Sequence, residues 1–309
     1  MTSSSAGSTP WTLFAALAGA VMISFSAIFF ALSEVSATTG AFFRAGYALP
    51  VLFALWFIRR KEDRRPMRRR WMAFAAGVAL GTDIVAWHAA IEFIGTGLAT
   101  LLANTSVIFV AIGAWILLGE RPRNTTMGAI PVILVGVTLV SGFGQGNPYG
   151  VDPIRGTLLG LVAATFYATY FLAFRHSNEA HAPGAGPLME ATFGMLLAAT
   201  MLGLISSGLD VTPSWPAHGW LVALAMGAQV IGWMMIGYAL PRLPAVETAT
   251  IILIQPALTI LWGALIFGER PSALQIVGAV VVLSGVAFVA LVRARRAPVS
   301  QPAAPTPQG

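Results

Sequence analysis

The sequence predicts an all-α integral membrane protein with ten transmembrane helices, built as two inverted five-helix repeats. The first observation behind this is composition. The 309 residues are 57% hydrophobic and only 10% charged, whereas a soluble domain carries about 25% charged residues. A soluble protein of this size needs more charged residues than this on its surface. The sequence therefore predicts that lipid, and not water, surrounds most of the chain.

The second observation is an internal repeat. The tract Gly119–Pro122 returns as Gly268–Pro271, 149 residues later, and the same offset carries Gly136 onto Gly285. Each copy of the tract separates two apolar runs. A repeat of this length indicates one membrane unit written twice.

Ten apolar runs are long enough to cross a bilayer, since a spanning helix needs about 20 mostly apolar residues. They lie at 11–32, 39–58, 71–91, 96–118, 125–143, 156–174, 187–207, 218–239, 245–267 and 273–292. We expect repeats at 11–143 and 156–292, joined by a loop at 144–155. Residues 1–10 are expected to form an N-terminal cytoplasmic segment and 293–309 a disordered cytoplasmic tail.

The third observation is the placement of charge. Fifteen of the eighteen Lys and Arg residues fall in loops on one predicted side, eight of them between Arg59 and Arg70. Cytoplasmic loops carry this excess, so both termini are expected in the cytoplasm. Each half has five spans, an odd number, so the second half should enter the membrane from the opposite side.

Several function classes are excluded by the residues. There is no cysteine, which removes disulfides and thiol chemistry. There is no P-loop, no Gly-x-Ser-x-Gly elbow and no histidine-rich metal cluster, so we expect no ATP-driven step, no cofactor and no metal. The basic residues end apolar runs instead of forming a stripe with aromatic residues, so no nucleic acid is expected as partner.

The segments 87–137 and 239–286 resemble the two repeats of EamA-type carriers of the drug/metabolite transporter superfamily. The shared pattern is a small-residue entry, a mid-helix proline, a Gly-Glu-Arg corner and a Gly-rich next helix. The resemblance implies a ten-helix carrier of small metabolites in the inner membrane, often directed outward. One departure is that Val107 stands where the second repeat has Pro256.

The resulting expectation is a multi-pass inner-membrane secondary transporter that exports small metabolites, with amino acids and related compounds as candidates, by alternating access. Alternatives of the same fold are an uptake carrier and a facilitated-diffusion permease. A more remote alternative is an integral-membrane lipid-processing enzyme. Expected partners are a small-molecule substrate and membrane lipid, with protons as a candidate coupling ion and a homodimer left open.

Asp83 is the sharpest candidate site residue, because a charge in the middle of a span is costly and should face the bundle interior or water. It can act in coupling or substrate binding, or serve as a structural hydrogen-bonding group. Trp87 lies one turn further on the same face. His88, which can face Glu92, and Glu190 are further proton-coupling candidates.

Other polar and aromatic residues near the predicted midplane can line a substrate path or bond across helices. They are Asn104, Thr105, Ser106, Tyr167, Gln229, Trp233 and Gln255.

A last group is expected to gate or to stabilise the fold. Arg44 cannot readily lose its proton, so we expect it to pair with Glu34 or to attract a substrate carboxylate. Pro256 frees a backbone carbonyl in its helix. Glu120 and Glu269 recur at the two Gly-Glu-Arg corners, where capping and ion pairing with the adjacent arginine explain them.

Overall fold

The computed structural model describes residues 10–119, 121, 124–177, 185–239, 243 and 245–294, and all regular structure within them is helical. The helices are α1 Pro10–Ser24, α2 Ser26–Ser33, α3 Ala37–Arg59, the 3₁₀ turn η1 Arg60–Glu62, α4 Met67–Ala103, α5 Ser106–Leu118, α6 Asn124–Val140, α7 Pro153–Ser177, α8 Ala185–Ile205, α9 Ala217–Ala223, the π-helix η2 Leu224–Gly232, α10 Trp233–Ala239, α11 Ala245–Phe267 and α12 Ala273–Ala294.

The ten predicted spans are all helical. Seven helical stretches of the described residues have the length and apolar composition of a membrane span, and three shorter apolar helices accompany them. The shorter ones lie at Ser106–Ile116, Asn124–Val140 and Ile254–Phe267. The fold is therefore the multi-span helical bundle that the sequence predicts.

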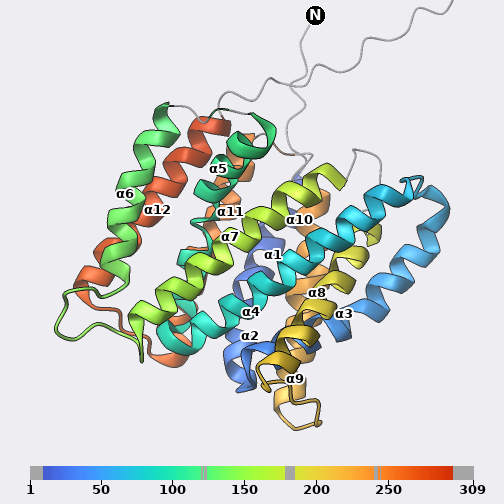
Figure 1. Cartoon of the computed structure of the whole chain (residues 1–309), viewed down its shortest axis with the longest axis horizontal. Helices are drawn as coiled ribbons and strands as arrows, with labels where there is room; N and C mark the ends of the chain where they lie inside the picture. Colours follow the sequence, from blue (N-terminus) through green and yellow to red (C-terminus); the bar gives the residue numbers. More distant parts are fainter. Residues whose placement is uncertain are drawn as a thin grey trace, which may run out of the picture.

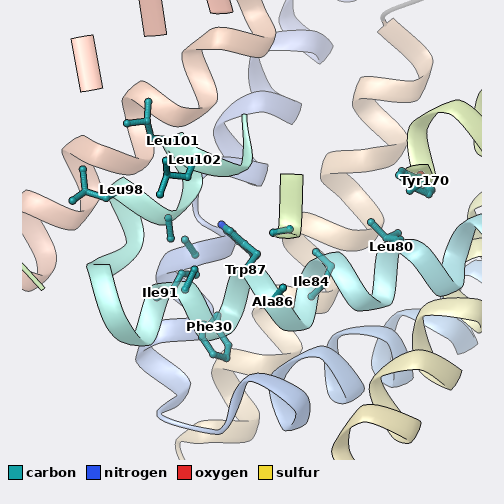
Figure 2. Packing of buried hydrophobic residues seen from close by; sticks show 14 of the residues in the cluster. Phe30, Leu80, Ile84, Ala86, Trp87, Ile91, Leu98, Leu101, Leu102 and Tyr170 are labelled. Carbon is teal, nitrogen blue, oxygen red and sulfur yellow. The ribbon is translucent and has the colours of Figure 1, made fainter. Parts of the chain in front are cut away.

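The sequence predicts a connection between the third and fourth spans, at residues 91–96, and the structure breaks the helix within it. The 37 residues of α4 are two helices that meet at a kink at Gly95, which is non-helical at φ 78° and ψ 173°. Glycine adopts this left-handed backbone readily because it has no Cβ. One residue thus redirects the chain, and Figure 2 shows α4 changing direction between Ile91 and Leu98. A second break follows at Asn104 and Thr105, before α5.

Helix packing reveals the symmetry between the two repeats. The packing of α4 on α7 corresponds to that of η2 and α10 on α1, and the packing of α5 on α7 corresponds to that of α11 on α1. Each of these contacts joins the two repeats. The pairs α3–α8 and α6–α12 join each element to its own counterpart, and they lie at opposite sides of the bundle (Figure 1). These paired contacts are what a pseudo-two-fold axis between inverted repeats requires.

Small residues allow these helices to approach closely, as is usual where packing rather than hydrophobic burial drives association in lipid. A Cβ on Gly136 of α6 would lie 3.0 Å from the carbonyl oxygen of Gly278 on α12. Gly194 of α8 meets the backbone of α4 at Phe74 in the same way. Gly128, by contrast, faces open space and borders an apolar groove of about 530 Å³ between α6 and α12.

Candidate functional site

A chain of buried polar side chains crosses the interior between the two repeats. Arg44 of α3 donates from Nε to Oε1 of Gln229 on η2 at 2.9 Å, and from Nη1 to Oγ of Ser26 on α2 at 3.0 Å. Gln229 donates in turn to Oγ1 of Thr192 on α8 at 3.3 Å. All four side chains are buried. An arginine surrounded by apolar helices needs such acceptors, because its charge is otherwise unsatisfied in the bilayer interior.

The predicted pair of Arg44 with Glu34 is wrong. Glu34 ends α2 in a left-handed conformation at φ 52°, and its side chain is exposed. The partners of Arg44 come instead from helices that follow or precede it at a distance in the chain, Gln229 being 185 residues away. A carboxylate was expected as partner, but a neutral amide and a hydroxyl take that place.

Asp83 lies in the core on α4, with only 5% of its surface exposed. Its charge interacts with that of Arg44, but the two are not in direct contact. Among the described residues no hydrogen bond holds its carboxyl group. Tyr167 of α7 interacts electrostatically with Asp83 and packs beside Tyr170, their ring centroids 5.9 Å apart. The structure therefore brings Asp83, Arg44 and Tyr167 together from three helices.

Two further polar atoms of α4 are buried without a partner in the described structure. They are Nε1 of Trp87, one turn beyond Asp83, and Oγ1 of Thr100, beyond the kink at Gly95. Figure 2 shows Trp87 on α4 with its ring nitrogen turned toward the segment that carries Leu101 and Leu102. A buried donor without an acceptor costs about 1–3 kcal/mol. Such atoms are where a bound molecule could supply the missing hydrogen bond.

His88 does not face Glu92. Its ring stacks on Phe30 with centroids 3.7 Å apart, and Nδ1 lies 3.3 Å from the carbonyl oxygen of Ala37. Nε2 is buried without a partner. The Glu92 carboxylate accepts a hydrogen bond from the backbone N–H of Ala37, so both side chains bond to the start of α3 instead of to each other.

Glu190 lies at the end of the bundle that carries the basic loop. It accepts a hydrogen bond from Nε of Arg70 at 2.6 Å and forms an ion pair with Nη1 of Arg65 at 2.9 Å. Asp63 completes this cluster by pairing with Nε of Arg65, also at 2.9 Å. Sequence reasoning missed both the Arg65 and Arg70 contacts, which join residues more than 100 positions apart.

The remaining path-lining candidates make local or packing contacts. Asn104 donates from Nδ2 to the carbonyl of Thr100 at 2.8 Å, and Thr105 from Oγ1 to that of Leu102 at 2.6 Å, so these side chains satisfy the break before α5. Ser106, which begins α5, is buried. Trp233 of α10 is half-buried and packs with the cluster between α3 and η2.

On α11, Gln255 is half-buried and Pro256 is buried inside the helix. One turn beyond lies a contact that sequence reasoning missed. Thr259 donates to the backbone oxygen of Ser24 at 3.1 Å, and Nε1 of Trp262 donates to the hydroxyl of Ser24 at 3.0 Å. These bonds fix α11 to the break between α1 and α2.

Glu269 is buried, but it does not pair with the adjacent Arg270. Its carboxylate accepts hydrogen bonds from the backbone and hydroxyl of Thr96 and from the backbone of Gly97, on the far side of the break in α4. It caps a helix in the other repeat, where a negative charge suits the positive end of the helix dipole. Glu120, its counterpart in the first repeat, lies outside the described residues. Among those residues no cluster of His, Asp and Glu could hold a metal ion.

The bundle of inverted repeats with a charged and polar interior defines a multi-pass membrane transporter. The chain belongs to the EamA-like transporter family, whose model matches residues 10–142 and 154–291. This confirms the predicted resemblance, and it indicates a transporter instead of an enzyme.

Curated relatives agree with this class. The chain is 27% identical over 290 residues to the pseudopaline exporter CntI of Pseudomonas aeruginosa strain PAO1, an alignment that covers 91% of this chain and 96% of the relative. It is 25% identical over 232 residues to the threonine/homoserine exporter RhtA of Salmonella typhimurium strain LT2, covering 74% and 72%. A solved structure titled "Crystal structure of protein" shares the fold, with a TM-score of 0.61 at 18% identity over 92% of this chain and 98% of the other.

Proposed function

We propose that this protein is a secondary carrier that exports small zwitterionic metabolites, amino acids and related compounds, across the inner membrane by alternating access. One observation carries the proposal: a basic side chain, Arg44, and an acidic one, Asp83, are both buried in the core without forming an ion pair, and Arg44 is bound to Gln229 of the other repeat. Charges at membrane depth are costly and mark substrate and ion pathways.

The chemistry of these groups suits a molecule with both charges. Two of the three guanidinium nitrogens of Arg44 are engaged by Gln229 and Ser26. The third, Nη2, has no protein partner among the described residues and can donate to a carboxylate. The Asp83 carboxyl can accept from an ammonium group. Trp87, one turn beyond Asp83, offers a further unpaired polar atom.

The direction is supported by the relatives, whose names describe exporters of pseudopaline and of threonine and homoserine. Amino acids carry the carboxylate and the ammonium group that Arg44 and Asp83 complement. With the basic loop in the cytoplasm, the chain begins and ends on the inner side. Inverted repeats supply two arrangements of similar energy, one open to each side.

Asp83 is also our proposed proton-coupling carboxyl. Of the three coupling candidates, Glu190 already pairs with Arg65 and Arg70, and His88 is stacked on Phe30. Asp83 alone combines burial with a carboxyl that no described residue binds.

The test is uptake of radiolabelled threonine and homoserine into proteoliposomes, with and without an imposed pH gradient. Asp83→Asn and Arg44→Lys are expected to lower the rate about tenfold or more, since one charge-assisted hydrogen bond contributes roughly 1.5–3 kcal/mol. Glu62→Gln, at an exposed carboxylate outside the bundle interior, is the control and should keep the wild-type rate. Wild-type transport by Asp83→Asn at every pH would refute the role of Asp83.

A further inference from the structure

Three donors on Thr96 and Gly97 hold the carboxylate of Glu269, and we call this site the seat. Oε1 accepts from the backbone nitrogen of Thr96 at 2.6 Å and from its hydroxyl at 2.8 Å, and Oε2 accepts from the backbone nitrogen of Gly97 at 3.1 Å. The side chain is buried, with 6% exposed. Carboxylates bound by several backbone N–H groups at a helix start are held strongly, because charge and dipole act together.

Glycine makes this seat possible at three positions. A Cβ on Gly95 would lie 2.7 Å from Oε1 of Glu269, and one on Gly97 would lie 3.3 Å from Oε2. A Cβ on Gly263, in α11, would overlap the same oxygen. The seat therefore tolerates no larger residue on either helix while the carboxylate occupies it.

The seat joins two groups of helices that alternating access must separate. Gly95–Gly97 belongs to the group formed by α4, α5 and α7, whereas Glu269 follows α11, which also packs with α1 and α12. At the same end α11 packs directly on α4, where a Cβ on Gly97 would lie 3.0 Å from the Cα of Ile260. In the described residues, no comparable packing joins α5 to α11, the symmetry-related pair.

The other copy of the repeat lacks the seat. The positions 149 residues away in the other repeat hold neither the three glycines nor the threonine. Gly95, Thr96, Gly97 and Gly263 correspond to Pro244, Ala245, Val246 and Ala114. Alanine has no hydroxyl to replace that of Thr96, and none of the three counterparts of the glycines is a glycine. Glu120 is kept, but the surroundings that bind Glu269 are not.

We propose that Glu269 is a one-sided latch that closes the end of the carrier opposite the basic loop. The latch makes the resting state closed at that end, so that an exporter loads from the basic side. This inference rests on the proposed transport function, but the latch itself can be measured without substrate. Opening requires Glu269 to leave Thr96 and Gly97, whereas the matching positions of the other copy lack the Thr96 hydroxyl and the glycines.

The absence of cysteine from the chain allows a clean test. A single reporter, Ser106→Cys, lies at the start of α5 in the interior. A membrane-impermeant maleimide is added to one side or the other of oriented vesicles, and the labelling rate is measured without substrate. In the reporter background, Glu269→Gln should raise labelling from the side of Arg270 about tenfold, because it loses one charge-assisted bond and sets a donor against the Gly97 N–H.

Two variants sharpen the result. Thr96→Val removes only the hydroxyl bond and should raise labelling from the same side about threefold. Glu120→Gln, the counterpart at the other corner, should leave labelling from both sides unchanged. If Glu269→Gln does not fold, as judged by its melting temperature, Thr96→Val carries the test.

Unchanged labelling in both latch variants overturns the proposal, as does an equal response to Glu120→Gln. Failure of amino acids to be transported, with the labelling result intact, would instead reject the substrate class and leave the latch standing.

Discussion

Two loops occupy symmetry-related places at opposite ends of the bundle, yet they are anchored by different chemistry. At the basic end, the loop between α3 and α4 is held to the start of α8 by ion pairs of Asp63, Arg65, Arg70 and Glu190. Gly186 at the start of α8 leaves room for them, since a Cβ there would lie 2.8 Å from Oδ2 of Asp63.

At the opposite end, neutral groups fix the loop between α8 and α9 to the start of α3. The hydroxyls of Ser36 and Thr39 both donate to the carbonyl oxygen of Gly208, and Thr39 accepts from the backbone nitrogen of Asp210 at 2.9 Å. The Asp210 carboxylate bonds to its neighbour Thr212 instead of crossing to α3.

The difference teaches that repeat symmetry conserves where a loop is anchored but not the interaction that anchors it. An anchor of buried charges loses much when one partner is removed, because the others stay behind unpaired. An anchor of hydroxyls and carbonyls loses one modest bond at a time. The comparison therefore predicts unequal sensitivity of the two ends.

The largest effect is expected at the basic end. Glu190→Gln removes the partner of Arg65 and Arg70, both of which lie against it, and should lower stability by about 3 kcal/mol. The measurement is the apparent melting temperature in detergent. Glu62→Gln, in the exposed pair with Arg59, is the control and should leave the melting temperature unchanged. A fall no larger than that of the control would mean that the basic-end cluster does not stabilise the fold.

A smaller effect is expected at the hydroxyl anchor. Thr39→Val preserves shape but removes the bonds to Gly208 and Asp210, at a cost of about 1–2 kcal/mol. Its control is Thr165→Val on the exposed face of α7, where the hydroxyl bonds only within its own helix. If Thr39→Val were as destabilising as Glu190→Gln, the contrast between the two ends would be lost.

The smallest effect is expected at low pH, in the contribution of Asp63 to stability. Burial would raise the pKa of the Asp63 carboxyl, but the hydrogen bonds and charge of Arg65 outweigh it and hold that pKa below its usual value. A lowered folded pKa stabilises the protein above the unfolded pKa, about 3.9, and this contribution is lost as pH falls through the folded pKa.

The melting-temperature difference between wild type and Asp63→Asn should therefore stay constant from pH 8 to 5 and shrink below about pH 4. The groups facing Asp63 are Arg65 and Trp56, and Arg65 continues to Glu190. A difference that changed between pH 8 and 6 would assign the pH dependence to another group.

Much of the fold could be predicted from the sequence because spans are long, apolar and local. The ten runs and the interior position of Asp83 follow from composition and spacing. The partner of Arg44 could not be predicted, because Gln229 is 185 residues away and a carboxylate was the simpler partner to expect.

The contact of Glu269 with the other repeat was not predicted, although the sequence held an indication of it. Because Arg270 is adjacent in the sequence, a local ion pair was the expected interaction. The carboxylate instead binds Thr96, which belongs to the other repeat. The glycines at 95, 97 and 263 have no glycine at the matching positions 149 residues away. That asymmetry within a repeat was the available indication of a one-sided contact.

By itself, the sequence determined that the chain enters lipid ten times in two inverted halves. The reason is that hydrophobic length and loop charge act on each segment separately. Only the tertiary structure decided which polar groups meet. A buried charge takes whatever donor or acceptor the packing of distant helices brings within about 3 Å, and that geometry depends on all the helices at once.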